Sequence, residues 1–254
     1  MAFPIPKQGS FDKTEQTEQR RKWIGELFNS DLYSDLQLIS GEKSYAAHRI
    51  VVCFHSSVIR DKIITTLVES KPGVTGGFTF ANKYRFEDDD PQCVDCVIQY
   101  FYRWNYEIPD QLQDVKMNHE PEDIKDADSS LRNGSTVAGS ELVAHVKVFA
   151  LAEKYAIGPL KALSVSKFEA TAQQHWGSHY LAEAAREAYK PNVPDNIREM
   201  RDSIVEFLHT RLHILREGPM KQLLLALPQL SLDLHMRRLT NTAPASALSI
   251  FGRK

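Results

Sequence analysis

The chain has 254 residues, of which 42% are hydrophobic and 25% are charged. This is enough apolar material for one sizeable core or two smaller ones, and it is not the composition of a disordered chain. The 31 basic and 33 acidic side chains nearly cancel to a net charge of -2, which disfavours sequence-independent binding to nucleic acid.

The three cysteines, Cys53, Cys93 and Cys96, are few and odd in number, which is typical of reduced thiols and not of a disulfide framework. The first ten residues contain two prolines and a glycine and no apolar run, so we expect no signal peptide. No window approaches the roughly 18 apolar residues that a membrane-spanning helix needs. We therefore expect an intracellular protein, cytoplasmic or nuclear, with no membrane partner.

Residues 1–30 are expected to form an N-terminal arm and an amphipathic helix from Thr14 to Asn29. An apolar stripe on a surface helix needs a partner surface, either on its own domain or on a second copy across a two-fold axis. The sequence leaves both alternatives open. The stripe consists of Trp23, Ile24, Leu27 and Phe28.

Residues 31–108 are expected to form a small sheet with flanking helices. Apolar and polar residues alternate from Tyr33 to Ile39 and resume from Ser44 to Ala47, which predicts a β-hairpin. Two short helices follow, the second after Ser56-Ser57. Further on, Asp88-Asp89-Asp90-Pro91 predicts the start of a buried helix that ends near Asn105, because carboxylates and proline favour the first turn of a helix.

The second half is expected to be helical after an acidic interruption. Residues 109–141 read as a solvated linker or insertion, since Glu107 to Asp128 contain eight acidic and two basic side chains. Residues 142–174 predict two helices separated by Gly158-Pro159. Residues 175–254 predict a helical extension, in which a helix capped by Asp195 carries apolar residues as far as Leu215 and stops at Gly218-Pro219.

Five segments between about Leu27 and Ala172 resemble BTB/POZ domains. They are a Ser-Asp-apolar strand with an apolar-x-Ala-His-basic segment after it, a helix start, an acidic turn, the end of a central helix, and a helix similar to Ala-Asp-Lys-Tyr. Each segment alone is unspecific, and their order carries the resemblance. The segments are Leu32–Leu38 with Tyr45–Val52, Ser56–Ile59, Phe86–Pro91, Val97–Tyr102 and Val148–Ile157.

The resemblance implies an α+β fold, a BTB/POZ fold of a small sheet flanked by helical hairpins with a helical C-terminal region. The domain's two parts would be residues 31–108 and 142–174. With its acidic insertion and helical tail, the chain looks like BTB proteins of filamentous fungi. The family's zinc-finger, kelch and MATH companions are absent from this sequence, so the client is not indicated.

The resemblance also implies a protein-interaction module and not an enzyme. The leading hypothesis is a substrate-recruiting adaptor of a cullin-RING ubiquitin ligase, with a cullin and a second copy as partners and no small-molecule substrate. The alternative is a dimerising nuclear scaffold or transcriptional co-regulator. An enzyme with a spatially assembled site is a distant third, because no nucleophile elbow or phosphate-binding glycine loop is present.

The interaction residues implied by the resemblance add to the stripe of the first helix. Asp35 and Arg49 are expected to pair on one partly buried surface. Leu67-Val68-Glu69 has the apolar-x-Glu form that many cullin adaptors use beside the central helix, and Tyr102 lies in a segment that matches the family's cullin-facing positions.

No catalytic, cofactor or metal site is expected. Cys93 and Cys96 have the spacing of half a zinc site, but four ligands are needed and the second pair is missing, so two small buried positions are the better interpretation. The pairs His175 with His179 and His209 with His213 have no glutamate placed as in zinc hydrolases, so exposed helix polarity is favoured. His48 is expected to be structural, bridging backbone groups.

Overall fold

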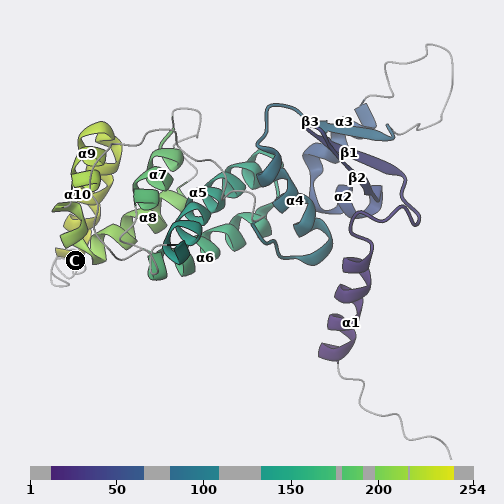
Figure 1. The fold of residues 1–254 in the computed structure, drawn as a ribbon, viewed down its shortest axis with the longest axis horizontal. Coiled ribbons are helices and arrows are strands. Elements are labelled where there is room, and N and C mark those ends of the chain that lie inside the picture. The colour runs from purple at the N-terminus through teal and green to yellow at the C-terminus, as the bar shows by residue number, and fades with distance from the viewer. Residues whose placement is uncertain are drawn as a thin grey trace, which may run out of the picture. The chain divides into compact units, whose positions relative to one another are not determined.

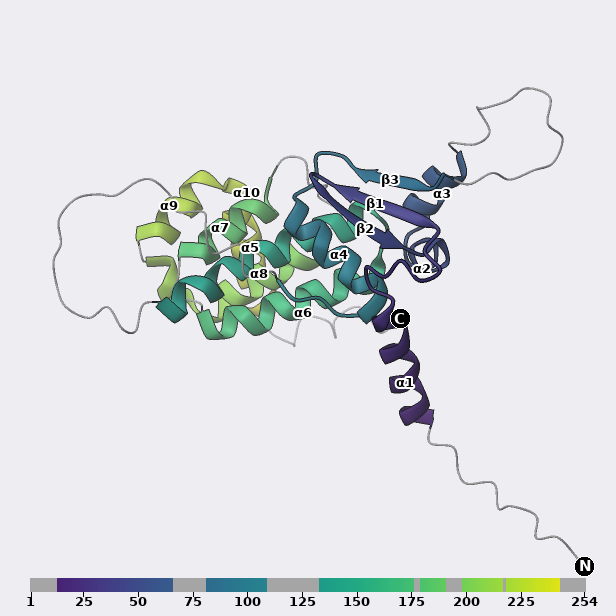
Figure 2. The same ribbon diagram turned by 45° about the vertical axis from the view of Figure 1, so that its right-hand side comes forward.

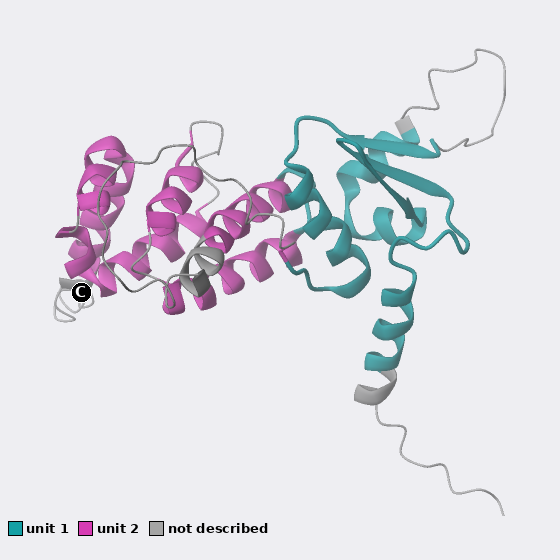
Figure 3. Cartoon of the chain, viewed as in Figure 1, with its two compact units in different colours: residues 1–107, 154–157 teal, residues 108–153, 158–254 magenta. Residues whose placement is uncertain are grey.

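The computed structural model describes residues 13–65, 81–108, 133–175, 179–190, 198–216 and 218–242 (Figure 1). The chain divides into two compact units (Figure 3). Unit 1 comprises Met1–Glu107 with Lys154–Ile157, and unit 2 comprises Ile108–Glu153 with Gly158–Lys254. Among the residues described, no helix is both long enough and apolar enough to cross a membrane.

Unit 1 contains the predicted hairpin. Strand β1 (Leu36–Ser40) pairs antiparallel with β2 (Lys43–Ala47), and β3 (Lys83–Phe86) pairs with the other edge of β1 in parallel (Figure 2). The two-residue loop between β1 and β2 requires a positive φ at its first position, and Gly41 supplies it with a φ of 57°. Buried and half-buried residues alternate along β1, so one face of the sheet packs into the core.

Short helices pack against this sheet and against one another. Helix α1 (Lys13–Glu26) contacts α4 (Pro91–Arg103), and α2 (Arg49–His55) contacts both α3 (Ser57–Thr65) and α4. The predicted start of α4 is confirmed, because the Asp90 side chain accepts a hydrogen bond from the Gln92 backbone N–H at 3.0 Å. The left-handed Trp104, with a φ of 53°, ends the helix.

The core of unit 1 includes residues from beyond the acidic segment. Tyr155 and Ile157 are fully buried in this unit. The Ser56 hydroxyl donates to the Tyr155 carbonyl at 2.8 Å, and the same hydroxyl accepts from the Ile59 backbone N–H at the start of α3. A single serine therefore joins residues 154–157 to the helices near the hairpin.

The described part of unit 2 is built from α-helices and the 3-10 helix η2. Helix α8 is central, with α6, α7 and α10 packed against it, and α9 contacts α7 and α10. The apolar side chains that these helices share form one buried cluster, which includes Phe168, Leu181, Ile204, Leu208 and Leu223. The elements are α5 (Asn133–Lys154), α6 (Gly158–His175), α7 (His179–Ala188), α8 (Glu199–Thr210), the 3-10 helix η2 (Leu212–Arg216), α9 (Gly218–Ala226) and α10 (Pro228–Thr242).

Several helix boundaries differ from the sequence prediction. Helix α1 ends at Glu26 and not at Asn29, so Leu27 and Phe28 of the predicted stripe lie after the helix. Helix α5 begins at Asn133 and not at Leu142, because the prediction followed the apolar stripe and the first turns of the helix have no such stripe in the sequence.

The helix expected to run to Leu215 ends at Thr210, and η2 follows it. Gly218-Pro219 does not stop a helix but begins α9, where proline is tolerated because first-turn N–H groups lack partners.

Candidate protein-interaction surface

The predicted stripe of the first helix is only partly covered in unit 1. Ile24, Leu27 and Phe28 are half-buried, whereas Trp23 is 64% exposed. Phe28 lies edge-on to the ring of Tyr102 at 6.0 Å between centroids, and the Arg103 guanidinium lies 4.6 Å from the centre of the Phe28 ring. Packing within unit 1 therefore partly covers Ile24, Leu27 and Phe28, and it leaves the indole of Trp23 exposed to solvent.

Tyr102 and His48 are hydrogen-bonded to each other in the interior of unit 1, and the Tyr102 ring also contacts Phe28 of the stripe. The Tyr102 hydroxyl accepts from the His48 backbone N–H at 3.0 Å and lies 3.0 Å from His48 Nδ1. His48 Nε2 lies 2.7 Å from the Leu32 carbonyl oxygen, which only accepts, so Nε2 carries the proton and Nδ1 accepts from the tyrosine. His48 is structural, as predicted. Burial raises the pKa of Tyr102 to about 12.

Tyr102 itself has no exposed surface. Its contacts are inside unit 1, so a charged substitution here would disturb the core before it disturbed any partner. Leu67 and Glu69, the other residues implied for a cullin contact, lie outside the described residues.

The structure brings Asp35 and Arg49 together. Asp35 Oδ1 accepts from the Arg49 backbone N–H at 2.7 Å, which satisfies a first-turn donor of α2 from a neighbouring segment. The guanidinium is 3.9 Å from Asp35 Oδ2, and its Nε donates to the Ala81 carbonyl at 3.2 Å. The Asp35 side chain is half exposed, so solvent screens the ion pair, and the capping bond is the more important contribution.

Helix α2 presents a second set of apolar side chains that sequence reasoning missed. Ile50 and Phe54 are each 81% exposed, and their spacing of four residues places them on one face of the helix. Val52 is the buried residue of this helix. From the sequence alone, Ile50, Val52 and Phe54 are equally good candidates for the core. Only the structure shows that Val52 is buried and the other two are exposed.

The loop before β1 adds Leu32, 58% exposed, and Tyr33, 83% exposed. Tyr33 has a φ of 60°, an uncommon conformation for a bulky residue. The His48 bond to the Leu32 carbonyl fixes this loop next to the start of α2, while Phe28 and His48 both contact Tyr102. We call the exposed apolar side chains of these three segments the α1–α2 surface: Trp23, Leu32, Tyr33, Ile50 and Phe54.

The model of the BTB/POZ domain family matches residues 24–119. The chain contains a BTB/POZ domain. The matched segment includes the hairpin, α2, α3, β3 and α4, and the α+β fold class with a small mixed sheet and a helical C-terminal region is confirmed. BTB/POZ domains are protein-interaction modules, so the coarse functional prediction follows from the match. No curated protein matches the chain.

The residues weighed as metal ligands are dispersed. Cys93 and Cys96 are buried in α4, and no disulfide joins any of the three cysteines. The histidine pairs do not share a helix, since His175 ends α6 and His179 begins α7, while His209 lies on α8 and His213 in η2. In the described part of the chain, no three His, Cys, Asp or Glu side chains are placed to hold a metal ion.

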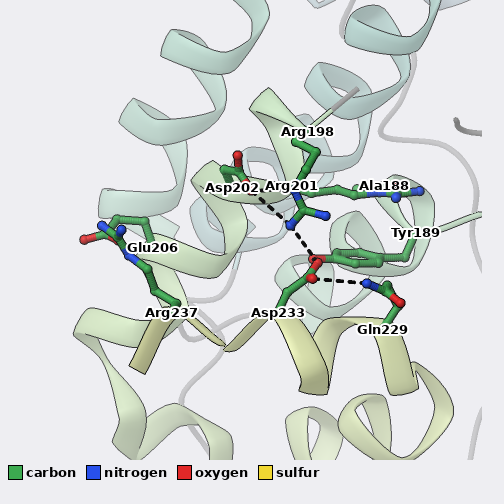
Figure 4. A network of polar contacts seen from close by, with 9 residues as sticks. All are labelled: Ala188, Tyr189, Arg198, Arg201, Asp202, Glu206, Gln229, Asp233 and Arg237. Atoms are coloured by element: carbon green, nitrogen blue, oxygen red, sulfur yellow. Dashed lines mark hydrogen bonds and ion pairs between the residues drawn. The ribbon is translucent and has the colours of Figure 1, made fainter. Parts of the chain in front are cut away.

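Unit 2 contains a polar network that the sequence did not indicate (Figure 4). Asp233 on α10 accepts from the Tyr189 hydroxyl at 2.8 Å and from the Gln229 amide at 3.1 Å, and it pairs with Arg198 at 3.0 Å. Burial and the bond to Asp233 raise the pKa of Tyr189. Arg201 donates to the Ala188 carbonyl at 2.9 Å, so α7, α8 and α10 are linked at one point.

Proposed function

We propose that the BTB/POZ domain pairs two copies of the chain through the α1–α2 surface, and that the pair recruits other proteins. The observation that carries this proposal is the exposure of Ile50 and Phe54 on one face of α2. Single exposed apolar residues are ordinary, whereas two large ones on the same face of a short helix favour an interaction site.

The chemistry of this surface suits a two-fold interface. Three of its five side chains are aromatic, the residue class enriched at the centres of protein interfaces. A two-fold interface uses the same patch on both copies, so apolar side chains can pack against their own copies across the axis. A stable pair of this kind buries roughly 800 Å² on each partner.

Pairing can be tested with the double variant Ile50→Glu and Phe54→Glu. We expect the parent to have the mass of a dimer in light scattering and the variant to have the mass of a monomer, because four glutamates would meet at the two-fold interface. Both side chains are largely exposed in unit 1, so the circular dichroism spectrum should not change.

The matched control is Leu212→Glu with Leu225→Glu, two exposed leucines of unit 2. It should retain the parent's mass. A parent whose mass is monomeric at every concentration, or a variant that stays dimeric, contradicts the proposal.

We further propose that the recruited partner is a cullin, which makes the chain an adaptor of a cullin-RING ubiquitin ligase. The support is the BTB/POZ domain itself, the helical unit that follows it, and the Leu67-Val68-Glu69 segment. The segments that match the family's cullin-facing positions run from Ser56 to Leu67, Pro91 to Tyr106 and Leu142 to Phe168. The role places the protein in the cytoplasm or the nucleus.

Calorimetry with an N-terminal cullin fragment tests this second proposal. We expect binding by the parent and at least tenfold weaker binding by Leu67→Glu, because interfaces concentrate their energy in a few apolar anchors. Leu225→Glu is the matched control, since it places the same charge on an exposed leucine of unit 2. If no heat is detected at tens of micromolar protein while a known adaptor binds in parallel, the nuclear scaffold becomes the better hypothesis.

A further inference from the structure

The last turn of α10 presents a threonine hydroxyl on the surface of unit 2. Thr240 is exposed, and its Oγ1 donates to the Arg237 carbonyl oxygen at 2.8 Å, one turn earlier in the helix. The helix ends at Thr242, and the last four carbonyl groups of a helix have no N–H partner within it. Helix ends open at a much lower free energy than the whole domain. The Thr240 hydroxyl is therefore accessible in the folded chain.

Two arginines precede this hydroxyl at a characteristic spacing. Arg237 and Arg238 stand three and two residues before Thr240, and both are exposed. Protein kinases select substrates by charge pattern, and the carboxylates of a basophilic kinase bind arginines at these two positions through paired hydrogen bonds. No other serine or threonine in the sequence has arginine at both positions. Sequence pattern and exposure therefore single out the same hydroxyl.

Arg237 also connects α10 to α8. Its guanidinium donates from Nε to Glu206 Oε2 at 2.6 Å, and both side chains are half-buried (Figure 4). Glu206, Arg237 and Thr240 line one groove of about 570 Å³. Residues three apart are neighbours on a helix surface, so Arg237 lies within reach of both Glu206 and a phosphate on Thr240.

We propose that Thr240 is a phosphorylation site for a basophilic protein kinase, and that its phosphate releases the end of α10 from α8. The kinase transfers the γ-phosphoryl group of MgATP to Thr240 Oγ1. The P–O bond to the β-phosphate breaks, a bond from phosphorus to Oγ1 forms, ADP leaves, and the hydroxyl proton passes to the catalytic carboxylate of the kinase. This regulation is independent of the pairing and the cullin binding proposed above.

The release follows from the charge of the phosphate. It adds about −1.5 to −2 and three strong acceptor oxygens, which compete with Glu206 for the Arg237 guanidinium. The phosphate also places negative charge near the Glu206 carboxylate and at the negative end of the helix dipole. Each effect disfavours the contact between the last turn of α10 and α8.

The site is tested on the full-length chain with MgATP and the catalytic subunit of cyclic-AMP-dependent protein kinase, and the phosphate is mapped by mass spectrometry. We expect it on Thr240 and expect none in this segment of Thr240→Ala. Arg238→Gln should react about tenfold more slowly, because one charged contact with the kinase is lost. Thr242→Ala, two residues later, is the matched control and should react like the parent.

Two measurements test the coupling to α8. Both arginines must face the kinase during transfer, so Arg237 has to leave Glu206 first. Glu206→Gln should therefore raise the rate about threefold, whereas Asp202→Asn, which removes a carboxylate of α8 that pairs with Arg198, should leave it unchanged. In the phosphorylated chain, amide hydrogen exchange in α10 should be about fivefold faster than in the unmodified chain, with no change in α4 of unit 1.

Four results would overturn the proposal. The first is a chain that takes up no phosphate while a reference substrate of the kinase reacts in parallel, and the second is phosphate mapped to a residue other than Thr240. The third is a Glu206→Gln rate equal to that of the parent. The fourth is hydrogen exchange in α10 that phosphorylation leaves unchanged or slows.

Discussion

Replacing Asp89 with alanine should lower the free energy of unfolding of unit 1 by about 2 to 3 kcal/mol. Asp89 accepts from the hydroxyl of Tyr155 and pairs with Lys154 at 2.6 Å, and its side chain is only 5% exposed. The largest contribution is the loss of an acceptor for a buried hydroxyl, which costs about 1 to 3 kcal/mol. Lys154 is half exposed, so the ion pair adds at most about 1 kcal/mol.

Two further variants separate the contributions. Asp89→Asn keeps an acceptor for Tyr155 but removes the charge, so it should cost about half as much as alanine. Glu87→Ala, at an exposed position two residues earlier, should lie within about 0.5 kcal/mol of the parent. The variants are compared in a Trp176→Phe background, so that tryptophan fluorescence during urea unfolding comes from Trp23 and Trp104, both in unit 1. An Asp89→Ala midpoint equal to that of the parent would show that the contact is not formed.

The same contact shows why much of the fold of unit 1 was predictable. The acidic turn before α4 and the segment around Tyr155 were each recognised from local sequence, and the structure joins them through Asp89 across 66 positions. Turn chemistry and alternation depend on neighbours along the chain, so the hairpin and the start of α4 were found from them.

Properties that depend on distant segments were not predictable. Ile50 and Phe54 have the same residue types as a core helix, and their exposure depends on what packs against α2. The Asp233 network joins residues from three helices, with Tyr189 44 positions away. The local sequence predicts neither the exposure of Ile50 and Phe54 nor the network around Asp233. Pairing of Asp35 with Arg49 was found because the family pattern supplied a long-range relation that spacing alone does not contain.

Lowering the pH should destabilise unit 2 through His145. This imidazole lies on α5, is 4% exposed, and is 3.4 Å from the Thr171 hydroxyl through Nε2. Burial, with the nearby Lys167 ammonium as a second cause, lowers the pKa of His145 from 6.5 to about 3. The folded protein therefore holds this histidine neutral, while the unfolded chain takes up a proton below about pH 6.5.

The contribution of His145 to the free energy of unfolding is fully present above pH 6.5. It is lost as the pH falls toward 3, because in that range the unfolded chain binds a proton that the folded protein does not. At pH 5 the loss should be about 2 kcal/mol, at 1.4 kcal/mol per pH unit below 6.5. His145→Gln cannot gain the charge, so its unfolding free energy should fall less than the parent's between pH 7.5 and 5. The exposed His235→Gln is the matched control and should follow the parent. Urea unfolding by circular dichroism at both pH values gives the comparison, and parallel losses in the parent and His145→Gln would contradict the prediction.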